Sequence, residues 1–432
     1  MTGAGQAPIA ASGVRWRIAG LLLVITTLTF IDRFNMSVAS KYIQQEFRLS
    51  DVQVGALLSA FVLGYALFQI PGGILGDRFG PRRMLVWAVL WWSLFTALTA
   101  AAPDLFLARW IGVPGSLWIV RFLIGCGEAP AFPNANKVIG LWMAPDERAR
   151  GNSSFIVGVG IGGTFTPPAI AYTMAHYGWR ICFVACGALG LIVAAIWYWY
   201  STDRPEQHPK VNAAELARIG AVHQIPRASL RAPWRRILSS TTVWALALSN
   251  FMLGYVVAIF YFWFYLYVVN VRKLQVMSGS YWSTVPFVIM LFSAPLGGYV
   301  SDRMMRRFGH PWGRRIPVLA GSALSCLCIV VGARIADPYL AICTLALAAG
   351  CNIFVSVSCW VLPNDLSRHY SASLSGLLNM ANNLGGVVSP TLTPWIAARY
   401  GWTTALDVAA VAMVGMGSLW LLIHPEDGID HA

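Results

Sequence analysis

Long apolar runs alternate with short polar segments along the whole chain. A helix needs about 20 residues to cross the roughly 30 Å hydrocarbon layer of a bilayer, and the runs have about this length. They lack the strict alternation of barrel strands, and membrane helices tolerate the Gly and Pro residues found inside many of them. The pattern predicts an all-α polytopic membrane protein with twelve spans: 17–40, 52–75, 84–103, 112–140, 151–175, 179–200, 241–269, 279–301, 316–335, 338–362, 371–396 and 401–423.

The composition agrees with a membrane location. Of the 432 residues, 57% are hydrophobic and only 11% are charged. This is more apolar surface than a soluble protein of this length can keep away from water. The cysteines lie within or at the edges of the spans without metal-ligand spacing, and the histidines lie in loops, span ends or tails. We therefore expect no disulfide framework and no metal or other cofactor.

The net charge of +13 is unevenly distributed. With twelve spans, the segments on the side of the termini carry most of the Lys and Arg residues. This asymmetry follows the positive-inside rule, so both termini are predicted to be cytoplasmic, in the cell inner (plasma) membrane. The basic excess then needs no nucleic-acid partner. Arg15 and Arg17 stand directly before the first span, which we interpret as an uncleaved helix because no cleavage site follows it.

The second half of the chain repeats the first. Several short stretches align at nearly one offset: Gly162-Gly163 and Pro167 with Gly385-Gly386 and Pro390, HYGW at 176–179 with RYGW at 399–402, and GDRFGPRR from Gly76 with the looser SDRMMRRFGHPWGRR from Ser301. Transporters with such repeats bind their substrate between the halves, near the bilayer midplane. The predicted organisation is a six-helix half at 1–200, a cytoplasmic linker at 201–240 and a second six-helix half at 241–432. We interpret the linker as a flexible connector in which Asn212 caps a short surface helix.

Four ionisable residues lie deep inside the apolar spans: Asp32 and Arg33 in the first, Arg121 and Glu128 in the fourth. A charge at the centre of a bilayer costs about 2.5 to 3.5 kcal/mol, so the four must face a polar cavity or one another. One interpretation is an ion-pair network that only locks two helices together, although a buried pair often stabilises less than apolar packing does. The other is coupling, in which an anion that competes for the arginines promotes proton uptake by the carboxylates. Lys137, nearer the end of the fourth span, is expected to extend into the interface.

At these residues the chain resembles the major facilitator superfamily, and within it the anion:cation symporter family, which includes bacterial sugar-acid permeases. The resemblance covers nearly the whole chain and lies in FIDRFNMSVA at 30–39, YALFQIPGGILGDRFGPRR at 65–83, RFLIGCGEAPAFPNA at 121–135, ERARGNSSFIVGVGIGGTFTPP at 147–168 and SGLLNMANNLGGVVSP at 375–390. The GDRFGPRR loop alone identifies only the superfamily. The resemblance implies the major facilitator fold, with twelve helices in two six-helix pseudo-repeat halves. It also implies a small organic anion and protons as the cargo of a chain that functions as a monomer.

By position, the resemblance implies that Asp32 and Glu128 carry the protons and that Arg33 binds the substrate carboxylate. Arg121 is implied to tune Asp32 or Glu128, or to assist with the anion. The side chains implied to hydrogen-bond the substrate are Tyr65 and Asn383, and more weakly Gln69, Trp360 and Asn379. The alternative for these side chains is an interfacial aromatic position or ordinary interhelical hydrogen bonding.

The chain departs from the sugar-acid carriers at two places. Phe30 and the glycine-rich GVGIGG at 158–163 stand where those carriers often have a Tyr and a Gln. Fewer hydroxyl-binding groups predict a more apolar pocket, which suits an aromatic or less hydroxylated acid. The glycines also spell GxGxxG, but no strand precedes them, so we interpret them as sites of close helix packing. The segment RWIGVPGSLW at 109–118 is also longer than the usual connection into the fourth span.

The loop GDRFGPRR predicts a gate at the cytoplasmic ends of the helices. Asp77 can accept backbone N–H groups at a neighbouring helix end. The basic residues of the loop can pair across helix ends, and breaking these contacts opens the inner side; they are Arg78, Arg82 and Arg83. The corresponding residues of the second half are Asp302 and Arg303. A plain basic loop is the alternative.

The main hypothesis is a proton-coupled importer of organic anions that works by alternating access. The alternatives are a proton antiporter that exports drugs or metabolites, a membrane enzyme and, more remotely, a receptor without transport. An enzyme is not expected, because the spans hold no intramembrane His and no metal or nucleophile constellation. Sugar acids fit the resemblance as substrates, and aromatic acids fit the departures from it.

Overall fold

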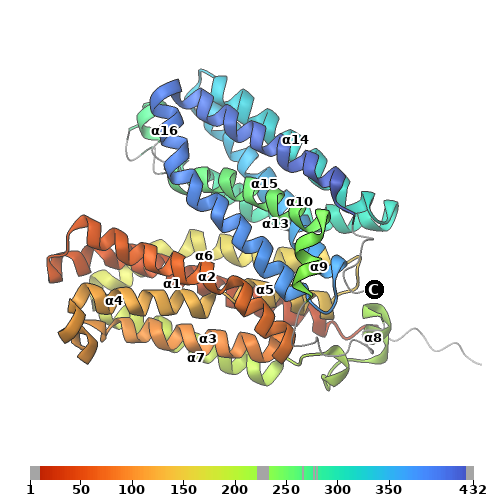
Figure 1. Ribbon diagram of the computed structural model, residues 1–432, viewed down its shortest axis with the longest axis horizontal. Coiled ribbons are helices and arrows are strands. Elements are labelled where there is room, and N and C mark those ends of the chain that lie inside the picture. The colour runs from red at the N-terminus through yellow and green to blue at the C-terminus, as the bar shows by residue number, and fades with distance from the viewer. Residues whose placement is uncertain (1–9, 221–232, 265–266, 276–277, 279–280, 425–432) are drawn as a thin grey trace, which may run out of the picture.

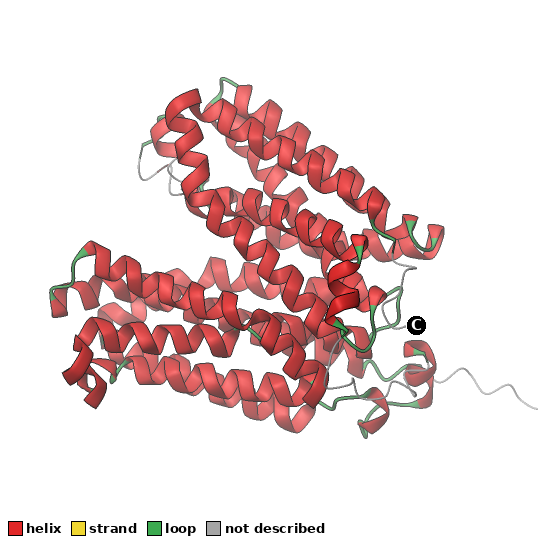
Figure 2. Ribbon diagram, viewed as in Figure 1, coloured by secondary structure: helices red, strands yellow, loops and turns green. Residues whose placement is uncertain are grey.

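The computed structural model describes residues 10–220, 233–264, 267–275, 278 and 281–424, and every regular element among them is a helix (Figure 2). The predicted cytoplasmic ends of the chain, 1–9 and 425–432, lie outside the described residues, as do the middle of the linker and short pieces of two predicted spans. The first bundle consists of α1 (Val14–Phe47), α2 (Asp51–Phe79), α3 (Pro81–Thr99), η1 (Ala102–Asp104), α4 (Phe106–Glu128), α5 (Ala131–Trp142), α6 (Arg148–Tyr177) and α7 (Trp179–Tyr200).

Three short helices follow in the linker: η2 (Pro205–Gln207), α8 (Ala213–Ile219) and α9 (Trp234–Ser239). The second bundle consists of α10 (Thr241–Ala258), the π-helices η3 (Ile259–Trp263) and η4 (Tyr267–Val271), α13 (Val285–Phe308), α14 (Trp312–Arg334), α15 (Pro338–Leu366), α16 (Ser371–Leu419) and the 3-10 turn η5 (Trp420–Leu422).

These helices account for the twelve predicted spans. Among the described residues, ten helical stretches are long and apolar enough to cross a membrane, with α4 and α5 counted as one stretch and α16 counted once. Gly401, at a φ of 86°, divides α16 into two helices. Gly178, at a φ of 83°, separates α6 from α7 at the matching place of the repeat. A left-handed conformation favours glycine, so the repeated YGW stretch marks the same turn in both halves. Dividing α16 and adding α3 gives twelve.

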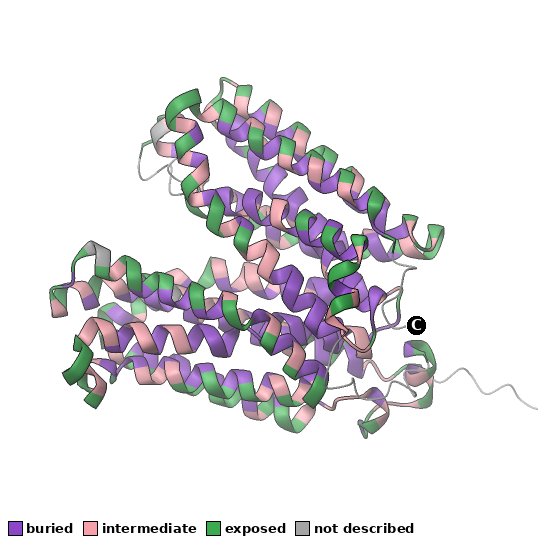
Figure 3. Cartoon of the chain, in the orientation of Figure 1, coloured by how far each residue is buried: buried purple, intermediate pink, exposed green. Residues whose placement is uncertain are grey.

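The helices form two bundles that pair their elements in the same way. In the first, α1 packs against α6, α2 against α4 and α3 against α7; in the second, α10 packs against α16, α13 against α15 and α14 against α16. Each bundle has its own buried hydrophobic cluster (Figure 3). Across the bundles, α6 packs against α13, and α2 and α5 pack against α16. The bundles converge where α8 and α9 lie and spread apart in the opposite direction (Figure 1). The region where the bundles converge is called the linker end.

Glycines allow α6 to lie directly against α1. A Cβ atom on Gly158 would collide with Thr26 and the carbonyl of Leu23, and one on Gly162 would collide with Phe30. The packing interpretation is therefore confirmed for two glycines of the GxGxxG motif: Gly158, and Gly160, where a Cβ atom would lie 3.1 Å from Leu291. Because glycine has no side chain, this stretch supplies no hydrogen-bonding group beside Phe30.

One expected boundary was wrong. The fourth span begins at Phe106 instead of residue 112, because the segment 109–118 is itself helical with a break at Gly112, whose φ is 74°. Pro114 follows closely, and a proline lacks the N–H that a continuous helix needs. The eighth span was expected from residue 279, and 279–280 lie outside the described residues. Ser278, Tyr281 and Trp282 beside them are helical, and a turn at 283–284 leads into α13.

The first part of the linker, 201–220, contacts α1 through α8, whereas 221–232 lie outside the described residues, so the interpretation of the linker as a flexible connector stays a prediction. Asn212 caps α8 as predicted, because its Oδ1 accepts the N–H of Glu215 at 2.9 Å. The Glu215 carboxylate, fully buried, then caps α1: it accepts the N–H groups of Val14 at 3.1 Å and Arg15 at 3.0 Å, and the hydroxyl of Ser12. The signal missed in the sequence is a single acid inside NAAELARI. A carboxylate at a helix N-terminus is favoured by the exposed N–H groups and by the helix dipole.

We propose that the chain divides into 1–200, 201–240 and 241–432, with the part of the linker that contains α8 acting as a strap on the first bundle. The Arg15 side chain supports this, since its Nη1 pairs with Glu215 of the linker at 3.1 Å and its Nε pairs with Glu147 of the first bundle at 2.9 Å. Arg218 of α8 pairs with Asp146 at 2.7 Å. The linker is thereby tied to the start of α6.

We expect Glu215→Gln to lower the thermal stability of the purified protein. Burial raises the pKa of Glu215, but hydrogen bonds from Ser12, Arg15 and Val14 outweigh burial and hold the pKa below its usual range. The stabilisation is therefore present above the unfolded pKa of about 4.3 and is lost as the pH falls through the folded value. At pH 7 the variant should lose about 1 to 3 kcal/mol, and the difference from wild type should shrink below about pH 4. The control is Asp104→Asn, an exposed acid of η1. Equal melting temperatures of Glu215→Gln and wild type at pH 7 would contradict the strap.

Candidate functional site

Arg33 of α1 and Glu128, the last residue of α4, form an ion pair inside the first bundle. Nη2 of Arg33 lies 2.5 Å from Oε1 of Glu128, and Nε donates a hydrogen bond to the same oxygen at 2.8 Å. The Glu128 side chain is fully buried, whereas 26% of the Arg33 side chain is exposed. The cation therefore reaches the surface of the bundle while its counter-charge stays inside. An anion that approaches the bundle can contact Arg33 without entering the interior.

Aromatic rings surround the Arg33 guanidinium. Its Cζ atom lies 4.6 Å from the ring centre of Tyr65, 5.0 Å from that of Phe30 and 5.3 Å from that of Phe61. Phe61 also lies 5.0 Å from Cζ of Arg121, so one ring contacts both cations. Each cation–π contact stabilises by about 0.5 to 2 kcal/mol, which offsets part of the cost of removing a guanidinium from water. The role of Phe61 was missed in the sequence, because a Phe in an apolar span looks the same whether it faces lipid or a cation.

Asp32 and Arg121 complete the group of four predicted charges. Both are buried, with 4% and 2% of their surface exposed. The charge of Arg121 interacts with those of Asp32, Glu128 and Arg33, so α1 and α4 bring the four residues together as expected. Several polar atoms of the group have no hydrogen-bond partner: Oδ1 of Asp32, Oε2 of Glu128, and Nε and Nη1 of Arg121. Buried polar atoms without partners are uncommon and mark places where a proton, a water or a ligand can act.

A second group of predicted residues joins the two bundles beside Arg33. The side-chain amide of Asn379 on α16 donates hydrogen bonds to the hydroxyl of Tyr65 at 3.1 Å and to Oε1 of Gln69 at 3.0 Å, both on α2. Asn383 donates to the backbone carbonyl of Asn379 at 2.7 Å. Because the Tyr65 ring also covers Arg33, the cation and the amides form one continuous site. Nε2 of Gln69 is buried without a partner.

Trp360 of α15 lies in a different contact. Its ring centre is 5.9 Å from that of Phe132 on α5 and 5.6 Å from that of Phe155 on α6. The ring therefore packs across the bundles against two aromatic side chains. These contacts do not connect Trp360 to the charged group, so its role in substrate binding stays a prediction.

Asp77 at the linker end caps a helix of the other bundle, which is the geometry predicted for it. Its carboxylate accepts the N–H groups of Ala372 at 3.2 Å and Ser373 at 2.8 Å, in the first turn of α16. Nζ of Lys137 pairs with the same carboxylate at 2.5 Å. The expectation that Lys137 extends into the interface was therefore wrong. The side chain is 8% exposed, because a nearby buried carboxylate offers a stronger partner than the interface does.

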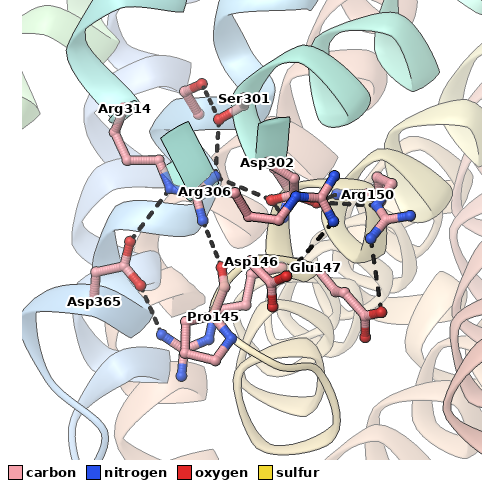
Figure 4. Close-up of polar contacts among 12 residues, drawn as sticks. Pro145, Asp146, Glu147, Arg150, Ser301, Asp302, Arg306, Arg314 and Asp365 are labelled. Atoms are coloured by element: carbon pink, nitrogen blue, oxygen red, sulfur yellow. Dashed lines mark hydrogen bonds and ion pairs between the residues drawn. The ribbon is translucent and has the colours of Figure 1, made fainter. Parts of the chain in front are cut away.

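Asp302 of α13 makes the reciprocal contact (Figure 4). It accepts the N–H groups of Ala149 at 3.0 Å and Arg150 at 2.9 Å, in the first turn of α6. Nη1 of Arg314 lies 3.1 Å from Oδ1 of Asp302, the oxygen that also accepts the N–H of Ala149, and Arg314 is fully buried. Each bundle therefore supplies the aspartate that caps a helix of the other.

Of the basic residues predicted to pair across helix ends, Arg82 does so within the first bundle, because its Nη2 donates to the carbonyl of Tyr198 near the end of α7 at 2.5 Å. Arg303 donates to the hydroxyl of Tyr299, one turn away on the same helix, at 3.1 Å. Arg78 and Arg83 are exposed. None of these contacts joins the two bundles, so other residues hold the linker end together.

The cations that join the bundles include Arg148 and Arg150, at the start of α6, and Arg306 and Arg314 of the second bundle, and Figure 4 labels the last three. Nη1 of Arg148 lies 2.6 Å from Asp365 at the end of α15, and Nε of Arg314 lies 3.6 Å from the same carboxylate. Nη2 of Arg314 also donates to the carbonyl of Pro145 at 2.8 Å. The motif ERARGN contains Arg148, but nothing in the sequence paired it with Asp365, because the two residues belong to different halves.

A buried amide contact lies beside these ion pairs. Asn136 of α5 donates to the hydroxyl of Ser375 on α16 at 2.7 Å, and Asn364 of α15 donates to Oδ1 of Asn136 at 2.9 Å. Helix caps, ion pairs and amides together close the linker end. No group of three or more His, Cys, Asp or Glu side chains in the described residues is arranged to hold a metal ion.

Comparisons with known proteins agree with this architecture. The family model described as Major Facilitator Superfamily matches residues 22–309. The chain is 30% identical over 420 residues to the probable sulfoacetate transporter of Cupriavidus necator, covering 96% of this chain and 95% of that protein. It is 30% identical over 430 residues to the D-galactonate transporter of Escherichia coli O6:H1, covering 96% of this chain and 97% of that protein.

A solved structure shares the fold. The proton:xylose symporter XylE bound to 6-bromo-6-deoxy-D-glucose matches with a TM-score of 0.75 at 16% identity, over 95% of this chain and 96% of that chain. The predicted fold and resemblance are confirmed, and the matched proteins are transporters and not enzymes. The chain therefore belongs to the Major Facilitator Superfamily of membrane transporters.

Proposed function

We propose that the chain is a proton-coupled symporter that imports an organic anion by alternating access, with the linker end and both termini in the cytoplasm. The observation that carries the proposal is the Arg33–Glu128 pair, in which a partly exposed cation is neutralised by a fully buried carboxylate. Two relatives support the class of substrate, since one is named for sulfoacetate and the other for D-galactonate, which are organic acids. The excess of Lys and Arg on the linker side supports the orientation and a location in the cell inner membrane.

Coupling follows from competition for Arg33. When the acidic group of a substrate pairs with Arg33, Glu128 loses its cation. A buried carboxylate without a cation is strongly disfavoured in its charged form, so Glu128 takes up a proton as the anion binds. The buried Asp32 beside Arg121 is the second candidate for protonation. If two protons accompany a monovalent anion, one net positive charge enters, which is worth about 2.3 kcal/mol per 100 mV of membrane potential.

The walls of the site favour an acid with a flat and weakly hydroxylated body. Phe30, Phe61 and Tyr65 present ring carbon beside the guanidinium. The amide of Asn379 is already shared between Tyr65 and Gln69. A sugar acid, with a hydroxyl on nearly every carbon, needs donors and acceptors that these side chains use on one another. An aromatic carboxylate needs only the cation and the rings.

Release to the cytoplasm requires the linker end to open. The caps from Asp77 and Asp302 and the Arg148–Asp365 pair all cross between the bundles, so all must break when the bundles rock apart. Such contacts hold one of two discrete arrangements in place, which is the usual basis of a gate. The arrangement in this structure has the linker end closed.

We expect Arg33→Ala and Glu128→Gln to separate binding from coupling in proteoliposomes. Arg33→Ala should reduce substrate-driven proton uptake at least about 30-fold, because the anion loses its cation and Glu128 is left buried without one. Glu128→Gln should still exchange anion across the membrane but move no protons with it. The matched control is Arg109→Ala, an exposed arginine of α4. Wild-type proton flux in both variants would refute symport, and accumulation of acid against inward proton flow would indicate an antiporter.

A second test compares benzoate-type acids with galactonate, glucuronate and sulfoacetate in the same vesicles. The aromatic acids should be taken up at the lowest half-saturating concentrations. Phe61→Leu should raise that concentration by up to about tenfold, as expected from the loss of one aromatic contact. Phe68→Leu, an exposed ring on α2, is the control. A preference for sugar acids would overturn the substrate class while leaving proton-coupled import intact.

A third test concerns the gate. Asp77→Asn and Asp302→Asn should each favour opening of the linker end at least about fivefold, since the amide can still cap the helix but loses the charge that pairs with Lys137 or Arg314, which costs at least about 1 kcal/mol. The readout is the rate at which a cysteine at the buried Ser375 reacts with a membrane-impermeant maleimide, in a background with the exposed Cys343 changed to Ser. Asp104→Asn serves as the control. Unchanged labelling in both gate variants would show that the caps do not control access.

A further inference from the structure

A cavity of about 130 Å³ lies at the linker end, apart from the site around Arg33. One ordered water needs roughly 10 to 15 Å³ on this measure, so the cavity has room for a small polyatomic ligand. Its walls come from three parts of the chain: Lys137 and Arg148 from the first bundle, Asn364, Arg368 and Ser371 from the second, and Ile219 with Gly220 from the end of α8.

The charges on these walls are those of an anion site. Three of the residues that line the cavity are Lys or Arg, and none of the described residues lining it is Asp or Glu. Asp365, the partner of Arg148, is shared with Arg314 at 3.6 Å and His310 at 3.9 Å, so one carboxylate serves several cations. The described lining of the cavity is therefore cationic, and the carboxylates that pair with Lys137 and Arg148 lie outside it.

Two further features point to a ligand. Nε of Arg148 has no hydrogen-bond partner, although Arg148 is only 6% exposed and lines the cavity. A buried guanidinium N–H without a partner is unfavourable, and an oxyanion satisfies it. Lys137, another buried cation of the walls, shares its carboxylate partner, because Asp77 also accepts two N–H groups at the start of α16.

We infer that this cavity binds a small oxyanion, such as a carboxylate, phosphate or sulfate group, from the cytoplasmic side in the proposed orientation. The walls meet only while the two bundles and α8 are together. A bound anion therefore favours the arrangement with the linker end closed, because a ligand shifts an equilibrium toward the state that contains its site. Cytoplasmic anion, including transported acid that has accumulated, then slows the inward opening of the carrier.

The experiment is thermal unfolding of the purified full chain in sodium phosphate and in sodium acetate, each against sodium chloride at equal ionic strength. Saturating oxyanion should raise the melting temperature by about 1 to 3 °C. Arg368→Gln should raise the half-saturating concentration at least about fivefold, as expected for a lost charge-assisted contact. Arg307→Gln, an exposed arginine at the end of α13, should behave as wild type.

The source of the anion is distinguished by repeating the measurement with a transported acid in Arg33→Ala. A rise in melting temperature that persists in Arg33→Ala comes from binding in the cavity. A rise that phosphate causes but acetate and the transported acid do not identifies a phosphate-specific site. No shift over chloride, or equal half-saturating concentrations in Arg368→Gln and wild type, would overturn the inference. Because unfolding is measured without transport, this outcome would leave proton-coupled import untouched.

Discussion

A guanidinium inside a lipid bilayer has to find its counter-charge within the protein, because neither water nor hydrocarbon supplies one there. Glu128 meets this need for Arg33, and three rings cover the rest of the cation. The pair is stable only as a pair, since loss of either member leaves a charge buried alone. A ligand that pairs with Arg33 in place of Glu128 must therefore be an anion. When it binds, Glu128 has to take up a proton, because it no longer has a cation beside it. Selectivity for anions and coupling to protons therefore have the same cause, which is the cost of leaving Arg33 or Glu128 charged and buried without its partner.

The linker end solves the same problem with different partners. There, buried carboxylates are satisfied by the N–H groups at helix starts as well as by cations, as Asp77 and Asp302 illustrate. Polar atoms without a partner occur in both regions, for example Nε of Arg148 at the linker end and Oδ1 of Asp32 near Arg33. The two regions differ in what their contacts connect. Those at the linker end join the two bundles, whereas the four charges near Arg33 all belong to the first bundle.

The sequence predicted the features that depend on local pattern. Helical spans follow from the length of apolar runs, and the four intramembrane charges were visible because each interrupts such a run. The cap made by Asp77 was predicted because GDRFGPRR places an acid at a helix end. The rest depends on tertiary contact. Glu215, in the linker, meets the start of α1, and Arg148 meets Asp365 from the opposite half, so no local pattern pairs them. Lys137 was misplaced because its burial is decided by Asp77 on another helix.

The exchanged caps make the contact between the halves self-complementary. Asp77 of the first half completes α16 of the second, and Asp302 of the second completes α6 of the first. This is the arrangement of an isologous dimer, in which one surface patch meets its own copy across a two-fold axis. Each half contains both an aspartate that caps a helix of the other half and a helix start that is capped in return. Two copies of one half can therefore make the same pair of caps with each other. Fusion of two such copies through the strap containing α8 turns an association between molecules into a hinge within one chain.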